Sequence, residues 1–425
     1  MKTKELIRLI DLGTYDDLFL DLYMDRSKLA YQKDRYKKAL LSHAEYYGDG
    51  EISIYSAPGR SEIGGNHTDH QHGQVLTASV NNDAIAVVEK IAEPCVYVKS
   101  HGFEQKKISL EHLAKIEEEE ETTGALIRGV LAKIKEMGYK VGGFKAYVIS
   151  DVLIGSGLSS SAAFETLIGS IVSGLYNEGK IGPVEIAQIG QYAENIYFGK
   201  PSGLMDQMAC SVGSLVHIDF EDTNQPKVEK IDFDLESCGY SMCITDSRGS
   251  HADLTADYAS IPKEMKQVAH CFDREVLGNI RAESILRRIH QIRETAGDRA
   301  VLRALHYAGE NERVELEVNA LKDGQFETFL SLVKKSGDSS FKYLQNVYSC
   351  QDVNHQNLSV ALAASDVILG DRGVSRVHGG GFAGTIQAFV PNDLVDEYKK
   401  TMEGIFGEDT CQVMMIRKYG GIKVM

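Results

Sequence analysis

Apolar residues recur every three or four positions along several stretches of the chain, and this spacing predicts helices with one buried face. In the stretch after residue 163 the apolar positions are Phe164, Leu167, Ile168, Ile171, Val172 and Leu175. A second stretch is expected to begin at Pro183 and to end at Gly199. Its apolar positions are Ile186, Ile189, Ala193 and Ile196. Residues 125–137 form a third amphipathic stretch, so we expect three helices in the middle of the chain.

Shorter apolar runs alternate with these helices and predict strands. The expected strands cover residues 52–56, 84–89, 144–150, 215–220, 385–390 and 412–416. The first of them is expected to enter a turn at 57–60. The first 50 residues and the region 265–340 are expected to be mostly helical. The pattern predicts a mixed α and β protein without repeats, with a boundary between two units near residue 220.

Size and charge narrow the class of protein. The chain has 425 residues, which is enough for two or three packed units. Its net charge of −15 and the lack of a basic stripe argue against a nucleic-acid-binding surface. The seven cysteines are scattered without CxxC spacing, which is typical of reduced thiols. Because we find no secretory leader and no run of transmembrane length, we expect a cytoplasmic protein that does not bind a membrane.

The loop before the first of these helices predicts an anion site. Residues 153–165 read Leu-Ile-Gly-Ser-Gly-Leu-Ser-Ser-Ser-Ala-Ala-Phe-Glu. A small-residue loop that opens a helix leaves backbone N–H groups unpaired at the positive end of the helix dipole, where phosphate binds. The glycines allow close approach, and a serine hydroxyl can reach a bound Mg²⁺. Taken alone, the segment is also compatible with a turn and a helix cap.

Residues 57–73 combine glycines with closely spaced carboxylate, amide and imidazole groups. Each of these groups makes directional hydrogen bonds to hydroxyls, so the segment suits a pocket for a polyhydroxylated ligand. A metal site at His67, His70 and His72 is an alternative, but no second cluster supplies further ligands at a usual spacing. An ordinary hydrophilic turn is the third interpretation.

Two carboxylates follow the predicted anion loop. Glu194 lies near the C-terminal end of the second predicted helix, and Asp206 comes after a Pro-Ser-Gly turn. Phosphoryl transfer needs such a pair, because one carboxylate can hold Mg²⁺ while the other lies beside the attacking hydroxyl. In isolation, either residue could be a surface acid or a helix cap. The glycines at 379–381 would let the backbone approach a ligand, or form a turn.

In their order and spacing, these segments resemble the GHMP kinase superfamily and, within it, the galactokinase family. Residues 57–69 resemble the sugar signature, and residues 155–162 the ATP loop Gly-x-Gly-Leu-Ser-Ser-Ser-Ala. Residues 202–207 are similar to the family's Cys-Gly-Ile-Met-Asp-Gln, and residues 376–384 to its third, Gly-rich motif. The helical region 303–350 also resembles that of galactokinases. The resemblance extends from about residue 50 to the end of the chain.

The resemblance implies an α+β fold of two lobes with the active site between them. Residues 46–220 would form an N-terminal lobe that binds sugar and ATP and is similar to domain 2 of ribosomal protein S5. Residues 221–425 would form a ferredoxin-like C-terminal lobe, and residues 1–45 a helical extension. The implied partners are a small-molecule sugar and ATP with Mg²⁺. We expect a monomer.

The resemblance also implies ATP-dependent phosphorylation of a sugar at C1, with galactose as the expected sugar. Asp206 would act as catalytic base or orient the C1 hydroxyl. Arg60 would keep Asp206 ionised and stabilise charge on the transferring group. The implied sugar-binding residues are Asn66, His67, Asp69, Gly203 and Tyr258. The implied ATP-binding residues are Gly155, Ser156, Gly157, Leu158, Ser159, Ser160 and Ser161, and Mg²⁺ would be held by Ser160, Ser161 and Glu194.

One position departs from the galactokinase pattern. The family reads Gly-Glu-His-Thr-Asp-Tyr where residues 65–70 of this chain read Gly-Asn-His-Thr-Asp-His. The family's glutamate contacts the C6 hydroxyl of the sugar, so Asn66 leaves open a C6-altered acceptor such as galacturonate. A catalytically inactive sugar sensor is an alternative of another class. The presence of Arg60, Glu194 and Asp206 argues against it.

Overall fold

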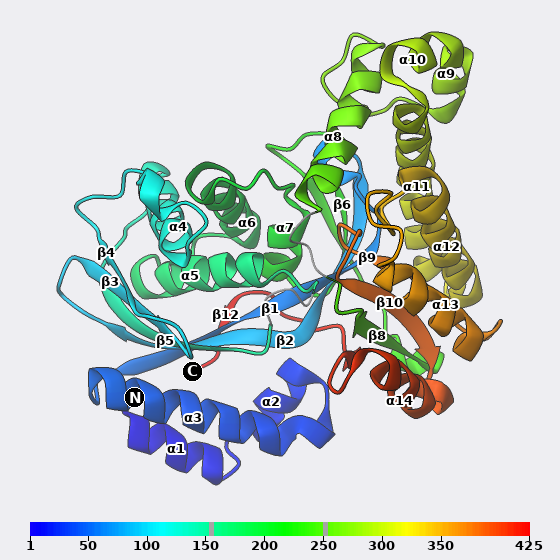
Figure 1. The fold of residues 1–425 in the computed structure, drawn as a ribbon. Helices are drawn as coiled ribbons and strands as arrows, with labels where there is room; N and C mark the ends of the chain where they lie inside the picture. Colours follow the sequence, from blue (N-terminus) through cyan, green and yellow to red (C-terminus); the bar gives the residue numbers. More distant parts are fainter. Residues whose placement is uncertain (153–156, 250–253) are drawn as a thin grey trace.

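Two β-sheets form the framework of the protein (Figure 1). The computed structural model describes residues 1–152, 157–249 and 254–425. The larger sheet runs in the order β12, β1, β2, β5, β3, β4, and β6 and β7 continue from β2. Its strands are β1 (Ile52–Gly64), β2 (Gln74–Lys90), β3 (Cys95–Ser100), β4 (Lys106–Ser109), β5 (Phe144–Ser150), β6 (Leu215–Asp219), β7 (Lys227–Ile231) and β12 (Ile422–Lys423). β3 and β5 pair in parallel, and the other strand pairs of the described residues are antiparallel.

Helices cover both faces of the larger sheet (Figure 1). The helices on one face are α1 (Thr3–Asp11), α2 (Asp16–Tyr23) and α3 (Leu29–Tyr47). Those on the other are α4 (Thr123–Glu136), α5 (Ser160–Tyr176), α6 (Pro183–Tyr192) and α7 (Met205–Val212). Along β5, Tyr147 and Ile149 pack toward α1–α3, whereas Ala146 and Val148 pack toward α4–α6. Because both faces are covered there, residues 146–149 of β5 form a continuous apolar run.

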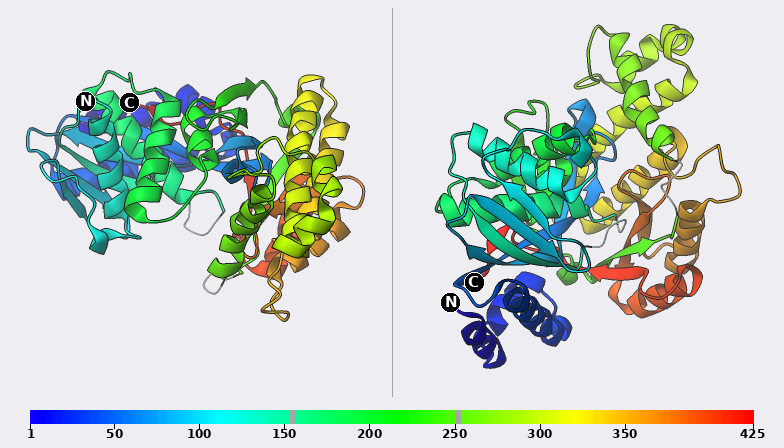
Figure 2. Two further views of the ribbon diagram at one scale, coloured as in Figure 1. Left: turned by 90° about the horizontal axis from the view of Figure 1, so that it is seen from above. Right: turned by 60° about the vertical axis from the view of Figure 1, so that its left-hand side comes forward.

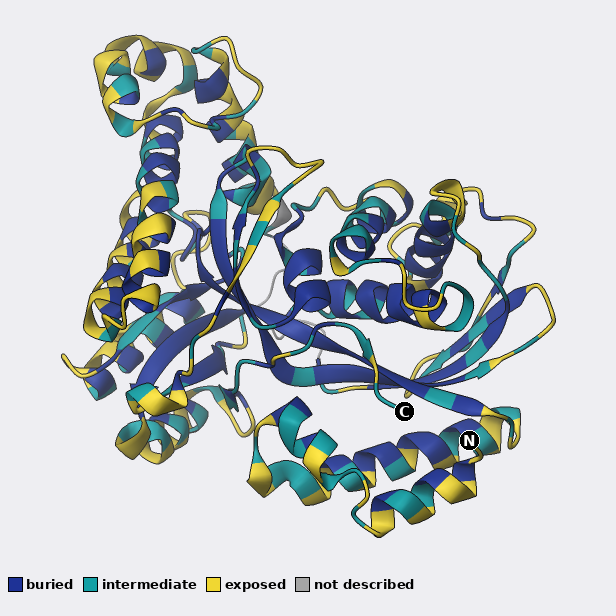
Figure 3. Cartoon of the chain, turned by 180° about the vertical axis from the view of Figure 1, so that it is seen from behind, coloured by how far each residue is buried: buried dark blue, intermediate teal, exposed yellow. Residues whose placement is uncertain are grey.

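The smaller sheet is also covered on both faces. Its antiparallel strands, in spatial order, are β11 (Cys411–Met414), β8 (Tyr240–Asp246), β10 (Thr385–Pro391) and β9 (Val374–His378). One face packs against α12 (Phe326–Ser339), and the other against α13 (Asn357–Leu369) and α14 (Val395–Phe406). Figure 3 shows both sheets largely buried, with the helices exposing their outer faces.

An arm of helices projects from the rest of the molecule (Figure 2). It consists of α9 (Ala282–Arg287) and α10 (Ile289–Ala296), together with the adjoining ends of α8 (Thr255–His270) and α11 (Asp298–Lys322). The apolar faces of these four helices pack against one another in a separate cluster. No helix of the described residues is both long enough and apolar enough to cross a membrane.

Most of the predicted elements are confirmed. The helix expected at 125–137 is α4, the strand expected at 144–150 is β5, and α6 begins at Pro183. The mixed helix and sheet content is as expected. The two-lobe division at residue 220 stays a prediction, and two strands beyond that position, β7 and β12, pair with strands of the larger sheet.

The turn expected at 57–60 is wrong, because β1 continues through it to Gly64. The ladder with β2 shifts register between Pro58 and Arg60, and this irregularity accommodates a proline, which has no N–H to donate. A side chain at Gly59 would lie 2.9 Å from the carbonyl oxygen of Leu158. Proline and glycine therefore serve a bulged strand that passes close to another segment.

The apolar face expected after Pro183 also needs one correction. Residues Ala193–Phe198 form a π-helical turn, which ends before Gly199 in the left-handed conformation. Ile196 is 48% exposed rather than on the buried face. A π-turn contains more residues per turn than an α-helix, so the positions after it rotate away from the face predicted by the regular period.

A buried ionic cluster around Asp83 ties both ends of the chain to the larger sheet. Asp83 lies on β2 and accepts hydrogen bonds from Arg35 of α3 (2.6 Å) and from Arg417 near the C-terminus (2.9 Å). The Tyr23 hydroxyl of α2 donates to the same carboxylate at 2.9 Å. Burial alone would raise the pKa of Asp83, but the two guanidinium groups outweigh it and lower that pKa.

We predict that Asp83→Asn lowers the free energy of unfolding by about 3–5 kcal/mol, because two buried arginines lose their counter-charge. Urea unfolding at neutral pH measures the loss. The control is Asp11→Asn, which removes an exposed partner of Lys37 and is expected to cost less than about 1 kcal/mol. Because the native pKa of Asp83 is lowered, its contribution is present above the unfolded pKa of about 3.9 and is lost as the pH falls below it. Equal losses in the two variants would contradict the assignment.

Candidate active site

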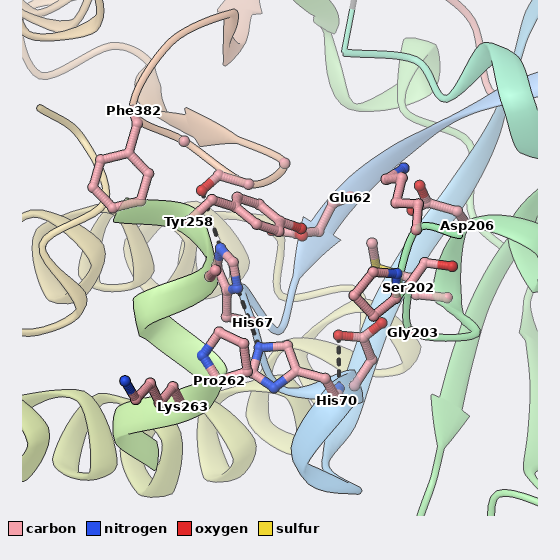
Figure 4. Close-up of a pocket in the computed structure, with 18 of the residues that line it drawn as sticks. Glu62, His67, His70, Ser202, Gly203, Asp206, Tyr258, Pro262, Lys263 and Phe382 are labelled. Carbon is pink, nitrogen blue, oxygen red and sulfur yellow. Dashed lines mark hydrogen bonds between the residues drawn. The ribbon is translucent and has the colours of Figure 1, made fainter. Parts of the chain in front are cut away.

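Two adjoining cavities lie where β1, α5, α7, α8 and the glycine-rich turn between β9 and β10 meet. The larger has a volume of about 970 Å³, and the smaller of about 240 Å³. Arg60, Lys200, Asp206 and residues 379–381 line both. The side chains of the larger cavity are shown in Figure 4.

An ion pair between a buried arginine and a partly buried aspartate lies at the junction of the cavities. Arg60 of β1 binds Asp206 in the first turn of α7 through both of its oxygens, with Nε–Oδ1 2.6 Å and Nη2–Oδ2 2.8 Å. The Ser159 hydroxyl donates to Oδ2 at 2.7 Å. Burial would raise the pKa of Asp206, but the charge and hydrogen bonds of Arg60 and the bond from Ser159 outweigh it, so the pKa is lowered. Asp206 is therefore a carboxylate at neutral pH.

The described part of the predicted anion loop lines the smaller cavity. Gly157, Ser159, Ser160 and Ser161 are among its lining residues, at the N-terminus of α5. Gly157 has φ +73°, and a side chain there would lie 2.2 Å from the Thr385 hydroxyl, so the position requires glycine. The Leu158 side chain is buried in the core, which leaves only its backbone for ligand contact. Gly155 and Ser156 lie outside the described residues.

Glu194 is the centre of a second polar cluster, beside the smaller cavity. Its carboxylate accepts hydrogen bonds from the hydroxyls of Ser161 (2.9 Å) and Ser202 (2.6 Å), from Lys200 (3.0 Å) and from Gln207 (2.9 Å). The residue is almost completely buried in the π-turn. The structure thus brings Glu194 and Ser161 together, and Ser160 lines the adjoining cavity.

The chemistry of this donor set fits Mg²⁺. Mg²⁺ binds proteins through one or two carboxylates and completes its shell with water and phosphate oxygens. Glu194 supplies a carboxylate, and Ser160 and Ser161 supply hydroxyl oxygens. No group of three or more His, Cys, Asp or Glu side chains in the described ranges could hold a metal by itself. That finding also leaves the alternative metal site at His67, His70 and His72 without support.

Four of the predicted sugar-binding residues line the larger cavity, namely His67, Asp69, Gly203 and Tyr258. A side chain at Gly203 would lie 1.7 Å from Asp69 Oδ2, so glycine is required for Asp69 to lie where it does. Burial and the nearby Asp206 raise the pKa of Asp69 to about 6. His67 Nε2 lies 3.0 Å from the carbonyl oxygen of Gly380, and burial lowers its pKa to about 4, so the ring is neutral.

Asn66, the fifth predicted sugar-binding residue, does not line either cavity. Its side chain is completely buried, and its amide nitrogen donates to Glu62 (2.9 Å) and to the carbonyl of Gly379 (2.8 Å). Its amide oxygen accepts from Asn346 at 2.9 Å. The geometry therefore gives no support to a direct contact between Asn66 and a ligand.

Several residues of the site were not assigned roles from the sequence. Glu62, within residues 57–73, and Lys200, between Glu194 and Asp206, line the larger cavity. His378 lines the smaller one, and its Nε2 accepts a hydrogen bond from the backbone N–H of Glu62 at 3.3 Å. The neutral ring then donates from Nδ1 to the Thr385 hydroxyl at 2.9 Å. The signals in the sequence were the charge of Lys200, six residues after Glu194, and the carboxylate of Glu62 within residues 57–73.

Comparison with known proteins identifies relatives of this chain. Residues 125–214 match the family model "GHMP kinases N terminal domain", and residues 41–90 match the "Galactokinase galactose-binding signature". The galactokinase of Thermotoga maritima is 31% identical over 354 residues, which cover 81% of this chain and 93% of that protein. The galactokinase of Clostridium tetani is 28% identical over 364 residues, covering 85% and 90%.

Solved structures show the same fold. The structure of Lactococcus lactis galactokinase complexed with galactose has a TM-score of 0.76 at 23% identity and covers 90% of this chain and 97% of that one. The mevalonate kinase of Methanococcus jannaschii has a TM-score of 0.60 at 16% identity, covering 86% and 99%. The predicted α+β kinase fold is confirmed.

We predict that Arg60→Met raises the pKa of Asp206 from below its ordinary value to above it, because burial is then opposed only by weaker partners. Carbon-13 NMR of protein labelled at the aspartate carboxyls measures the titration, and Asp206→Asn assigns the signal. Arg372→Met, which removes an exposed partner of Asp393, is the control and should leave the Asp206 titration unchanged. A titration of Asp206 that is the same with and without Arg60 would disprove the electrostatic role of this pair.

Proposed function

Because the chain belongs to the galactokinase family of GHMP kinases, we propose that it transfers the γ-phosphoryl group of ATP to the C1 hydroxyl of galactose. The relatives favour galactose over a C6-altered sugar, and catalysis over a sensor without activity. A cytoplasmic location and a monomeric state are further proposals. The cysteines, which are all unpaired, suit the reducing cytoplasm.

The observation that carries the proposal is the position of the Arg60–Asp206 pair. Both residues line the larger cavity, which four of the five predicted sugar-binding residues line, and the smaller cavity, which the described part of the predicted phosphate loop lines. A sugar in the first and a triphosphate in the second would meet at this pair. Phosphoryl transfer depends mainly on such positioning and on stabilisation of charge.

In the proposed reaction the C1 oxygen of the sugar attacks the γ-phosphorus. The new O1–P bond forms as the bond between the γ-phosphorus and the bridging oxygen of ADP breaks. Asp206, held ionised by Arg60, accepts the proton of the C1 hydroxyl and later releases it to water. The guanidinium of Arg60 stabilises the negative charge that develops on the transferring group.

On the nucleotide side, the N-terminus of α5 offers backbone N–H groups to the phosphates. Ser160, Ser161 and Glu194 would hold Mg²⁺, and the bound ion would neutralise charge on the β- and γ-phosphates. Lys200, which donates to Glu194 and lines both cavities, adds a further positive charge beside the phosphates. These groups keep the γ-phosphoryl group directed toward Asp206.

On the sugar side, Asp69 would accept hydrogen bonds from two hydroxyls, with Gly203 leaving it the necessary space. His67 and Tyr258 complete this wall, and their rings lie 5.4 Å apart between centroids. Asp69 is fixed by the backbone N–H of His70 at 2.8 Å. An axial or equatorial change at one hydroxyl would leave a buried acceptor unpaired, so the site can discriminate between epimers.

We predict that the full chain with Mg·ATP releases ADP on galactose with a kcat/KM on the order of 10² or more above that on glucose, because buried acceptors reject the wrong epimer. A coupled ADP-release assay measures this, with galacturonate as a third acceptor. Turnover of galacturonate alone would identify a C6-altered substrate. Galactose binding without ADP release would identify a sensor. Either result would overturn the proposal.

We predict that Asp206→Asn lowers kcat by about 10²–10⁴-fold while galactose still binds, because the proton acceptor is lost and the side chains proposed to bind the sugar are unchanged. The coupled assay measures turnover, and isothermal calorimetry measures binding. Asp393→Asn, an exposed carboxylate paired with Arg372, is the matched control and should keep full activity. Near-normal turnover of the Asp206 variant would rule out its role.

A further inference from the structure

Glu62 is a carboxylate in the wall of the larger cavity that the proposed mechanism does not use. It lies two residues after Arg60 on β1, so the two side chains are on the same face of the strand. Only 3% of Glu62 is exposed, and that part faces the cavity, since Glu62 is among the lining residues. In Figure 4 it is drawn between Tyr258 and Asp206.

The two oxygens of Glu62 differ in their surroundings. Oε1 accepts hydrogen bonds from Arg376 Nη2 at 2.8 Å and from Asn66 Nδ2 at 2.9 Å. Oε2 accepts no hydrogen bond from the residues that the structure describes. It is not fully enclosed either, whereas both oxygens of Glu317 are enclosed and without a hydrogen-bond partner. One oxygen is therefore held by the protein while the other is open to the cavity.

The groups that hold Glu62 are themselves fixed. Arg376 of β9 also donates to the carbonyl of Ile63 at 2.6 Å. Asn66 is held by the carbonyl of Gly379 and by Asn346, as described above. Because Arg376 and the partners of Asn66 are buried and come from distant parts of the chain, the carboxylate is positioned before any ligand arrives.

The charge of Glu62 is incompletely balanced. Burial raises the pKa of Glu62 to about 7, against the opposing effects of Arg376 and Arg60. The nitrogens of Arg60 are already bound to Asp206 and to the Gly157 carbonyl. A hydroxyl hydrogen that enters the cavity would supply the donor that Oε2 lacks.

We infer that Glu62 Oε2 accepts a hydrogen bond from a hydroxyl of the acceptor sugar other than the one phosphorylated, and that Asn66 is a positioning residue that holds Glu62. This inference rests on the proposed function and names a specificity residue for it. It also accounts for the departure at position 66, where the family has a carboxylate. In this chain a carboxylate reaches the same cavity from position 62, and Asn66 orients it.

The test uses Glu62→Gln, which keeps the shape of the side chain and removes its charge. We expect the KM for galactose to rise roughly tenfold or more, the loss typical of a hydrogen bond to a charged group, with a smaller change in kcat. The kcat/KM is then measured for 2-, 3-, 4- and 6-deoxygalactose with both proteins. For one of these sugars the two proteins should be equally effective, because the hydroxyl that Glu62 binds is missing. A loss of equal size for galactose and all four deoxy sugars would overturn the inference.

The positioning role of Asn66 has its own readout. Asn66→Ala should raise the KM for galactose in the wild-type background but have little further effect in the Glu62→Gln background, because it acts through that carboxylate. Additive effects of the two substitutions would show that Asn66 acts independently and would overturn this part. The matched control is Glu317→Gln, a buried carboxyl near the same arginine that does not line the cavity. The control should show no dependence on the sugar, and the same pattern in it would also overturn the inference.

Two measurements keep the outcomes separate. Thermal unfolding checks that each variant is folded. If Glu62→Gln does not fold, Glu62→Asp replaces it; this variant withdraws the carboxylate from the cavity and should also raise the KM for galactose. If the wild-type chain releases no ADP with any sugar, the proposed function fails, and the same comparison of sugars is made on binding by calorimetry. If the wild type is active but no deoxy sugar responds to residue 62, only the inference about Glu62 fails.

Discussion

The site depends on one partly buried ion pair, between Arg60 in β1 and Asp206 at the start of α7. The pair is bidentate and forms part of the wall that the two cavities share. Burying either charge alone would be costly, so each residue requires the other, and the hydroxyl of Ser159 adds a third contact. The strand β1, the described end of the predicted anion loop and the helix α7 therefore have a fixed relation at the point where phosphoryl transfer is proposed to occur.

A second buried network holds the backbone of the segment that leads to the larger cavity. Glu310 of α11 accepts the backbone N–H groups of Gly65 (3.1 Å) and Asn66 (3.3 Å). Burial would raise the pKa of Glu310, but the nearby Arg313 and other partners lower it to about 2, so it is ionised. His306 Nε2 lies 2.9 Å from the Asn66 carbonyl. The helix α11, which follows this loop by more than 200 residues in the chain, thus holds the loop that carries His67 and Asp69.

Local pattern predicted the elements well where neighbouring residues decide the outcome. The period of apolar residues located α4 and α5, and Pro183 marked the start of α6. It failed where a contact with a distant segment intervenes. Pro58 and Gly59 were interpreted as a turn, yet they lie in a bulged strand beside the carbonyl of Leu158. Ile196 was placed on a buried face, but a π-turn rotates it outward.

The sequence by itself determined which kinds of chemistry are present and in which order, because motifs and periodicity depend on residues close together in the chain. It identified Asp206, Glu194 and the Ser159–Ser161 segment, and family resemblance indicated that they meet. Only the tertiary structure decided which oxygens face the cavity. Asn66 is enclosed, whereas one oxygen of Glu62 faces the cavity, and their partners Asn346 and Arg376 lie about 300 residues further along the chain. Whether a buried polar group binds a ligand or the protein depends on such distant partners, and no local pattern encodes them.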